Sequence, residues 1–271
     1  MSFEDFFWGP DQGYFYRTFD KLKVDLKTIQ NTRVLGILVI IFWLIIGLYY
    51  SGDGSLHYCY LTTWGGYFTL ISLILNYIAA WDQRSNPGPV SGPMFYVWRT
   101  SVWFFELTLV FNVIITIIYW AFLTDDYSGD DPLRYWYGVF IHTMPLLFTM
   151  TDYLMQKWKF RSAHFLPMTI TGVLYMFVNY EATIESGKPL YPIIVWDPIW
   201  ESLLACLLVL GFMALVFAIL KHLTNSITGT SIYKYQNNDS IVYISTKPVI
   251  YKSITPNLQD KMVLVPVDLM V

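Results

Sequence analysis

Three kinds of side chain that can do acid–base or nucleophilic chemistry lie in segments of the sequence that are otherwise almost wholly apolar. Thr62 and Thr63 lie in "YLTTWGG", His142 lies in "FIHTMP", and Glu106 lies in "FFELT". An imidazole that takes the proton of a threonine hydroxyl turns that hydroxyl into a nucleophile. The residue types therefore predict a catalytic pair of Thr62 and His142, with Thr63 as an alternative hydroxyl and Glu106 as a supporting group.

The same residues also have a purely structural interpretation, which their spacing alone favours. Threonine and histidine side chains join membrane helices through hydrogen bonds. Glu106 lies about ten residues, or roughly 15 Å, into its apolar segment, where a lone carboxylate would be costly. It must therefore be protonated or paired, and Asn112 or His142 could be its partner.

The sequence contains no clear set of ligands for a metal ion or a cofactor. Its two cysteines, Cys59 and Cys206, are far apart and form no CxxC motif. A bis-histidine haem needs two imidazoles that face each other across helices. His142 has no second histidine in its part of the membrane, and His164 and His222 lie near the other side. We therefore expect neither a metal nor a cofactor.

The elements that must position the candidate residues are membrane helices. The chain has 271 residues, of which 55% are hydrophobic and 14% are charged, whereas soluble domains carry about 25% charged residues. A membrane span needs about 20 mostly apolar residues. Six segments have that length and composition: 34–50, 61–81, 97–123, 133–155, 165–184 and 198–220.

Basic residues predict the orientation of these spans. Side A comprises the two termini and the loops after the second and fourth spans, and side B comprises the other loops. All 17 Lys and Arg residues except Arg134 and Lys188 lie on side A or at the span ends that face it. Because such residues accumulate on the cytoplasmic side, side A is the cytoplasm, or the matrix of a mitochondrion. Asp152 lies near side A, where we expect it to pair with Lys157 or Lys159.

The expected fold class is all-α. We predict a polytopic six-helix transmembrane bundle over residues 33–222, an N-terminal arm outside the membrane over residues 1–32, and a tail over residues 223–271. The tail is expected to be irregular or strand-like, because "SIVYISTKPVIYKSI" and "MVLVPVDLMV" alternate like strands and contain proline. Such a segment is suited to lie along the surface of a partner. The N-terminus lacks the basic and apolar regions of a cleaved signal, so we expect the first span to direct insertion.

Three short motifs, "YLTTW", "HTMP" and "GKPLYP", resemble those of a known membrane-protein family. It is the androgen-induced-gene-like family of multispanning proteins, which includes rolling-stone-like proteins and some hydrolases of fatty acid esters of hydroxy fatty acids. The resemblance covers residues 56–224. It implies that Thr62, after an aromatic-Leu pair, is the nucleophile and that His142, before a threonine and a proline, is the base. Tyr191 and Pro192 match the family's "YP" before the last span.

The sequence departs from the family pattern in three places. A second threonine, Thr63, follows the first and blurs which hydroxyl is the nucleophile. The gap between His142 and Pro145 is shorter than the family's, which could rotate the imidazole relative to the threonine. A long tail also follows the sixth span.

Two functions are compatible with the sequence. The first, which we rank slightly ahead, is an accessory or structural subunit of a large membrane assembly, such as a respiratory-chain complex of the mitochondrial inner membrane. The aromatic arm "FEDFFWGPDQGYFYRTF" and the long tail favour it, because such segments fray unless other subunits hold them. The alternative is an intramembrane threonine hydrolase of lipid esters with Thr62 and His142 as its catalytic pair. Membrane lipids are expected partners in both cases and nucleic acids in neither, and the sequence leaves open whether the protein is an enzyme.

Overall fold

The computed structural model describes residues 7, 25–50, 54–85, 92–124, 132–155, 160–228, 233–236 and 240–243. Within these ranges the fold is helical apart from one short hairpin, which confirms the predicted helical fold class. The long helices are α2 (Leu26–Tyr50), α4 (Leu61–Ser85), α5 (Pro93–Ile118), α6 (Pro132–Met155), α7 (Phe165–Ser186) and α8 (Ile199–Thr228). Each overlaps one of the six predicted spans and most extend beyond it, although α5 ends five residues before the predicted end of the third span. The short elements are α3 (Gly54–His57), the π-helical turn η3 (Tyr119–Leu123), the 3-10 turn η5 (Ser162–His164), β1 (Tyr233–Gln236) and β2 (Ser240–Tyr243).

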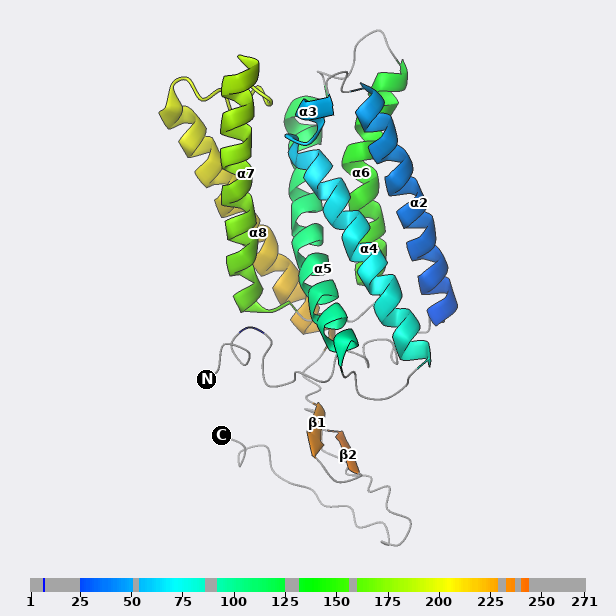
Figure 1. The fold of residues 1–271 in the computed structure, drawn as a ribbon. Coiled ribbons are helices and arrows are strands. Elements are labelled where there is room, and N and C mark those ends of the chain that lie inside the picture. The colour runs from blue at the N-terminus through cyan, green and yellow to red at the C-terminus, as the bar shows by residue number, and fades with distance from the viewer. Residues whose placement is uncertain are drawn as a thin grey trace, which may run out of the picture.

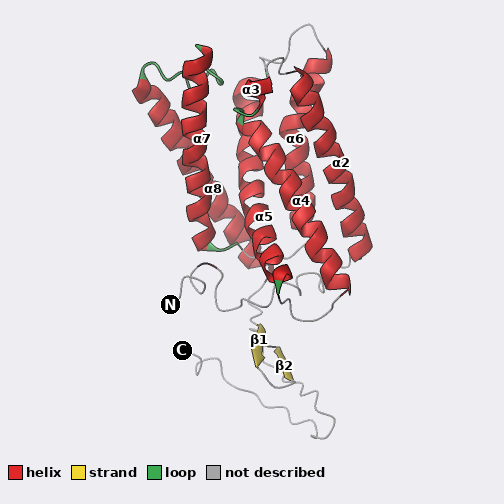
Figure 2. Ribbon diagram, viewed as in Figure 1, coloured by secondary structure: helices red, strands yellow, loops and turns green. Residues whose placement is uncertain are grey.

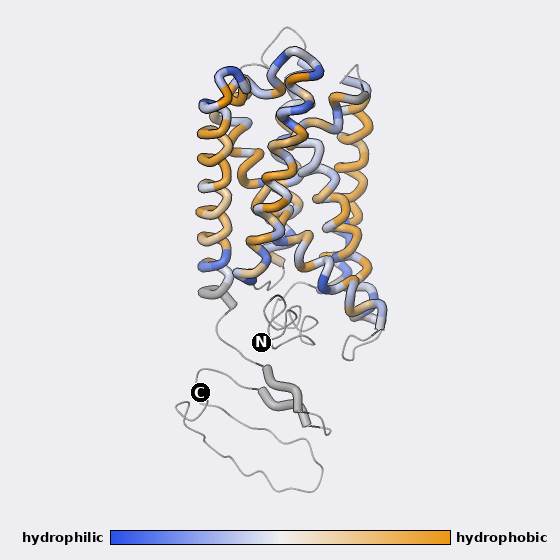
Figure 3. The backbone as a smooth tube through the Cα atoms, turned by 60° about the vertical axis from the view of Figure 1, so that its left-hand side comes forward, coloured by the Kyte–Doolittle hydropathy of each residue, from blue (hydrophilic) through white to orange (hydrophobic). Residues whose placement is uncertain are grey.

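Three of the six long helices are both long enough and apolar enough to cross a membrane. They are the segments Lys27–Tyr50, Pro93–Leu123 and Ile199–Thr224. The other three, α4, α6 and α7, are less apolar because they carry polar residues such as Asn76, Asp152 and Asn179, which are buried. Figure 3 shows that hydrophobic residues dominate the middle of the helices and hydrophilic ones gather at their ends. A polar residue that faces a protein interior lowers the hydropathy of its helix without exposing a polar group to lipid.

The helices form a group of four and a pair. Helices α2, α4, α5 and α6 pack together, while α7 and α8 pack on each other and join the group through α5 and α8 (Figure 1). Successive long helices run in opposite directions, so the start of α2 and the end of α8 lie at the same end of the bundle. A loop from Gly187 to Pro198 connects α7 to α8 at the other end (Figure 2).

Helix α5 is the centre of the bundle, and most of its residues from Trp98 to Ile115 are buried. A glycine on α4 allows that helix to approach it closely. A Cβ atom on Gly65 would lie 2.6 Å from Ile115 Cδ1, which is closer than real Cβ atoms approach other atoms, and a tight 3.1 Å from Asn112 Oδ1. Asn112 in turn donates a hydrogen bond to Thr69 Oγ1 at 2.9 Å. Small residues and polar cross-links of this kind hold membrane helices together.

Among the described residues, Asp152 pairs with an arginine of α2. Arg33 Nε donates to Asp152 Oδ1 at 2.9 Å, and Asn76 Nδ2 donates to Asp152 Oδ2 at 2.9 Å. Arg33 Nη1 also donates to the Asn76 carbonyl at 2.8 Å. All three side chains are buried, so the network joins α2, α4 and α6 inside the bundle near side A. Lys157 and Lys159 lie outside the described residues.

The partner of Glu106 is also different from the two that the sequence suggested. Glu106 Oε2 lies 3.1 Å from Nδ1 of His164, and both side chains are fully buried. The contact is close, although its alignment is not that of a directed hydrogen bond. His164 ends η5, just before α7, and its ring lies against the Phe7 ring with centroids 4.7 Å apart. Neither Asn112 nor His142 takes the role of partner, because the pair links α5 to the start of α7 instead.

The two predicted boundaries of the helical domain shift outward. Helix α2 begins at Leu26, inside the predicted arm, because Asp25 accepts a hydrogen bond from the Thr28 amide at 2.9 Å and so caps the helix. Helix α8 continues to Thr228. In the predicted tail, β1 and β2 pair in antiparallel register with Tyr233 opposite Tyr243, which agrees with its strand-like pattern. The remainder of the arm and of the tail lies outside the described residues, except for Phe7.

Candidate active site

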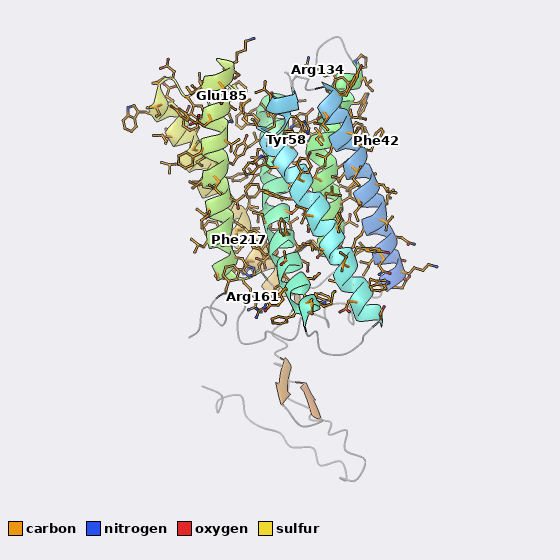
Figure 4. All side chains as sticks on the ribbon, viewed as in Figure 1. Phe42, Tyr58, Arg134, Arg161, Glu185 and Phe217 are labelled. Atoms are coloured by element: carbon orange, nitrogen blue, oxygen red, sulfur yellow. The ribbon has the colours of Figure 1, made fainter. Side chains whose placement is uncertain are left out.

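A polar chamber with a cavity volume of about 280 Å³ opens at the side-B end of the bundle. Its walls come from α2, α3, α4, α6, the turn η3 and the loop before α8. Arg134, the one charged side chain among its lining residues, lies at this end of the bundle, opposite the end that carries Arg161 (Figure 4). The residues that line the chamber are Gly47, Tyr50, His57, Tyr60, Thr62, Thr63, Leu123, Arg134, Tyr137, Ile141, His142, Leu190, Tyr191 and Pro192.

A second, apolar pocket with a cavity volume of about 70 Å³ lies between α5, α7 and α8 and reaches the N-terminus of α4. Isoleucine, leucine, valine and methionine side chains make up most of its wall.

The two cavities meet at the predicted catalytic pair. Thr62 and His142 each line both the polar chamber and the apolar pocket, and so do Leu123 and Tyr191. The structure therefore brings Thr62 and His142 to one site, between a space suited to water and a space suited to hydrocarbon. Thr63 lines the polar chamber but not the apolar pocket.

Three contacts hold His142, two of them to its imidazole and one to its backbone. Nδ1 lies 2.7 Å from the Gly138 carbonyl, which can only accept, so Nδ1 must carry the proton of this hydrogen bond. The ring stacks on Tyr119 with centroids 4.0 Å apart and planes 8° apart. Thr116 Oγ1 donates to the His142 carbonyl at 2.6 Å, which fixes the backbone of α6 against α5. In the neutral ring, Nε2 then carries the lone pair that a general base needs.

Two irregularities in the helices shape this site. Pro145 lies inside α6, and because it has no amide hydrogen it cannot bond the carbonyl four residues earlier, at Ile141. The end of the third predicted span widens into the π-helical turn η3, which carries Tyr119 behind the imidazole and Leu123 in both cavities. Wider turns of this kind are frequent at functional sites.

Thr62 is the second residue of α4, and tyrosine hydroxyls satisfy the amide just before it. The Leu61 amide donates to Tyr175 Oη at 3.0 Å and to Tyr191 Oη at 2.9 Å. Tyr175 Oη donates in turn to the Cys59 carbonyl at 3.1 Å. These bonds tie the start of α4 to α7 and to the loop before α8. They also turn the N-terminus of a 25-residue helix toward the site, where its dipole favours negative charge.

The amide of Thr62 itself is a candidate donor at the site. The next two amides, of Thr63 and Trp64, donate to the Tyr60 carbonyl at 3.1 and 3.2 Å. No hydrogen bond of the Thr62 amide is found among the described residues, as expected for the first turn of a helix.

Glu106, the predicted supporting group, is not part of this site. It lines neither cavity, and its contact with His164 places it toward side A. The correction has a simple geometric cause: Glu106 precedes Thr116, which touches His142, by ten positions on α5, or about 15 Å. Its interpretation as an interhelical cross-link fits this position.

Residues that the sequence did not single out complete the chamber. His57 on α3 is almost fully buried, and burial lowers the pKa of its imidazole below the usual value, so the ring is neutral at pH 7. Gly47 on α2 makes room for it, because a Cβ atom there would lie 2.8 Å from His57 Cε1 and 2.5 Å from Tyr137 Oη. The sequence held one usable signal, since His57, Tyr60 and Arg134 all lie at the side-B ends of predicted spans.

The described residues include no group of three His, Cys, Asp or Glu side chains placed to hold a metal ion. Cys59 and Cys206 form no disulfide among the described residues, and Cys206 lines the apolar pocket.

No family model, curated protein or solved structure matches the chain in the comparisons made with each. The resemblance to the androgen-induced-gene-like family thus rests on its three motifs. All three reach the same place: Thr62 comes from "YLTTW", His142 comes from "HTMP", and Tyr191 and Pro192 come from "GKPLYP". Each of these four residues lines the polar chamber.

Proposed function

We propose that the protein hydrolyses lipid esters, with Thr62 as nucleophile and His142 as general base and then general acid. The observation that carries this proposal is that both residues lie where the polar chamber meets the apolar pocket. A lipid ester has an apolar acyl chain on one side of its carbonyl, and its hydrolysis needs water on the other. The site offers both environments on the two sides of one hydroxyl.

The reaction proceeds in two halves. His142 Nε2 takes the proton of Thr62 Oγ1 as this oxygen attacks the ester carbonyl carbon, which forms a tetrahedral oxyanion. The oxyanion collapses, the bond to the alcohol oxygen breaks, and the alcohol leaves with the proton from His142. Water from the polar chamber then gives its proton to His142 and attacks the threonyl ester. Collapse of the second oxyanion releases the fatty acid and returns the proton to Thr62.

The start of α4 provides the electrostatic support that the oxyanion needs. The Thr62 amide is an N–H group of the first helical turn, and the dipole of the whole helix adds partial positive charge there. Donors that point at developing charge in a site away from bulk water stabilise a transition state by several kcal/mol. Gly138 plays the orienting part, because its carbonyl holds the imidazole in the tautomer with a lone pair on Nε2.

An assembly subunit with an inert hydrogen-bonded pair explains this site less well. A cross-link between helices needs neither a chamber nor a pocket beside it, and cavities cost packing energy. Because β1 and β2 form a hairpin, binding of a partner by the tail stays a separate prediction. Two strands alone are marginally stable, so the edge of a partner would stabilise them, whether or not the bundle is an enzyme.

The six long helices are further proposed to be six spans with both termini on side A. Support comes from their alternating directions (Figure 1) and from the basic residues, of which Arg134 and Lys188 alone belong to side B. We expect epitope tags at both termini to be accessible from one face of sealed vesicles, and a tag inserted at Lys188 to be accessible from the opposite face. Tags at the two termini that face opposite sides would contradict the topology.

A fluorophosphonate probe tests the proposed function directly, because such probes phosphonylate activated serine and threonine hydroxyls. We expect the purified full-length protein to be labelled, and an excess of a medium-chain lipid ester to compete with the label. The matched control is heat-unfolded protein, which retains every threonine but loses the site. Absence of labelling in folded protein, together with absence of ester hydrolysis, would refute the proposal.

A further inference from the structure

The apolar pocket has the same depth along each of its three helical walls. It is lined by residues within 111–118 on α5, 172–179 on α7 and 206–213 on α8. Each stretch covers about seven residue steps, or roughly 10.5 Å at 1.5 Å per residue. Helices α5 and α7 run toward side B and α8 runs away from it (Figure 1). The first residues of the α5 and α7 stretches and the last residue of the α8 stretch therefore share the deep end.

Aromatic side chains close this deep end. Phe111 and Met213 form its floor, and both are buried in the hydrophobic core. Phe217 lies one turn beyond Met213 on α8, in the half of the bundle toward Arg161 (Figure 4). Its ring packs against Phe160 and Phe165 with centroids 5.7 and 5.4 Å apart. The pocket is therefore a channel that is closed at its deep end, and it does not run the length of the bundle.

The other end of the pocket carries Thr62 and His142. An ester whose carbonyl carbon lies at Thr62 Oγ1 would direct its acyl chain down the channel. An extended hydrocarbon chain advances about 1.3 Å per carbon, given C–C bonds of about 1.5 Å at tetrahedral angles. A depth of roughly 10.5 Å thus holds about eight carbons.

We infer that the pocket selects esters of medium-chain fatty acids, with an acyl chain of about eight carbons, and that Gly172 is a residue that sets this length. This inference rests on the proposed function and adds the acyl length that the site accepts. Longer chains are excluded because their last carbons would have to displace Phe111 and Met213 at the floor. Shorter chains bind less well because they leave part of the apolar wall without contacts.

Gly172 controls the length because it gives the deep end its width. A Cβ atom there would lie 3.2 Å from Leu210 Cδ2, and both residues line the pocket. A leucine at this position extends about 4 Å beyond the backbone and so takes the place of roughly three carbons. Gly211 provides a matched control, because it lies on α8 with an exposed backbone, and a Cβ atom there would meet nothing within 4 Å.

The experiment measures kcat/KM of the full chain in nanodiscs for a series of p-nitrophenyl esters, from butanoate to hexadecanoate. We expect wild type to prefer the octanoate ester. Its kcat/KM for the tetradecanoate ester should be at least about tenfold lower, since one methylene in a pocket changes rates by about tenfold or more. G172L should move the preferred ester to pentanoate and lower the octanoate rate more than the butanoate rate. M213A should shift the preferred ester toward decanoate, and G211L should have the same dependence of kcat/KM on chain length as wild type.

Different outcomes separate this inference from the proposed function. Hydrolysis with no dependence on chain length, or an equal loss at all lengths in G172L, would overturn the inference and leave the hydrolase intact. If no ester is hydrolysed, the hydrolase is wrong, and native mass spectrometry of the detergent-released protein with octanoic and hexadecanoic acids tests the pocket itself. Selective retention of octanoic acid that G172L abolishes supports the pocket's length preference, whereas equal retention of both acids, or of neither, overturns it.

Discussion

Thr62→Ala and His142→Phe are each expected to reduce ester hydrolysis by about 1,000-fold or more, because each removes one half of a nucleophile–base pair. Alanine at position 62 has no hydroxyl to attack the carbonyl. Phenylalanine at position 142 keeps a ring against Tyr119, which stacks on the imidazole at 4.0 Å, but it has no lone pair to accept a proton. Steady-state rates with an octanoyl ester at equal protein concentration measure the effect.

Two further variants show whether the loss is chemical. Thr62→Ser keeps a hydroxyl at the same position and is expected to retain much of the activity. Thr151→Ala removes a hydroxyl that bonds only its own helix, to the Leu147 carbonyl at 2.7 Å, and should match wild type. If Thr63→Ala abolished hydrolysis while Thr62→Ala did not, Thr63 would be the nucleophile and the assignment from the family motif would be wrong.

Asp152→Leu is expected to lower the free energy of unfolding by about 3–5 kcal/mol, the cost of leaving one partner of a buried ion pair uncompensated. The carboxylate accepts from Arg33 and Asn76, both at 2.9 Å, and the arginine side chain is buried. Without the carboxylate, the guanidinium stays in the interior without its counter-charge. The midpoint of thermal unfolding in detergent, taken at one fixed scan rate, measures the change.

The double variant Arg33→Leu/Asp152→Leu provides the control for this prediction. Because it removes both charges together, it should be clearly more stable than Asp152→Leu alone. Arg33→Leu should be about as damaging as Asp152→Leu. Losses of stability that simply add in the double variant would show that the two side chains do not depend on each other.

The sequence predicts the helices of this protein well, because a span is a local property. Twenty apolar residues bounded by turn-forming stretches are visible in a single window, and each predicted span is helical in the structure. Two helices extend beyond their predicted spans. Asp25 caps α2 and starts it earlier than predicted, and α8 continues to Thr228. Whether all six helices cross the membrane remains a prediction, since α4, α6 and α7 are less apolar.

The partners of buried charges could not be predicted in the same way. Asp152 has nearby lysines in the sequence, yet it meets Arg33, which lies 119 residues away. Glu106 meets His164 from the start of another helix. Such pairs depend on which faces of distant helices pack together, and depth along the membrane normal does not fix the rotation of a helix about its axis.

The candidate site was predicted in part, less fully than the helices but better than the partners of the buried charges. Depth and direction were enough to place Thr62 and His142 in the same half of the membrane, and both line the junction of the cavities. The cavities themselves were not predictable, because the apolar pocket lies between α5, α7 and α8, and the polar chamber lies where α2, α3, α4 and α6 meet η3 and the loop before α8. His57 and Gly47 were missed for the same reason, since their role appears only when α2, α3 and α6 come together.

The most direct test of the account is the identity of the residue that carries the acyl group during turnover. Wild-type protein is mixed with an octanoyl ester, quenched in acid within one turnover, digested and examined by peptide mass spectrometry. The account predicts an octanoyl group on Thr62, absent from Thr62→Ala and strongly reduced in His142→Phe. Hydrolysis without any acylated peptide, or with the acyl group on another residue, would contradict it.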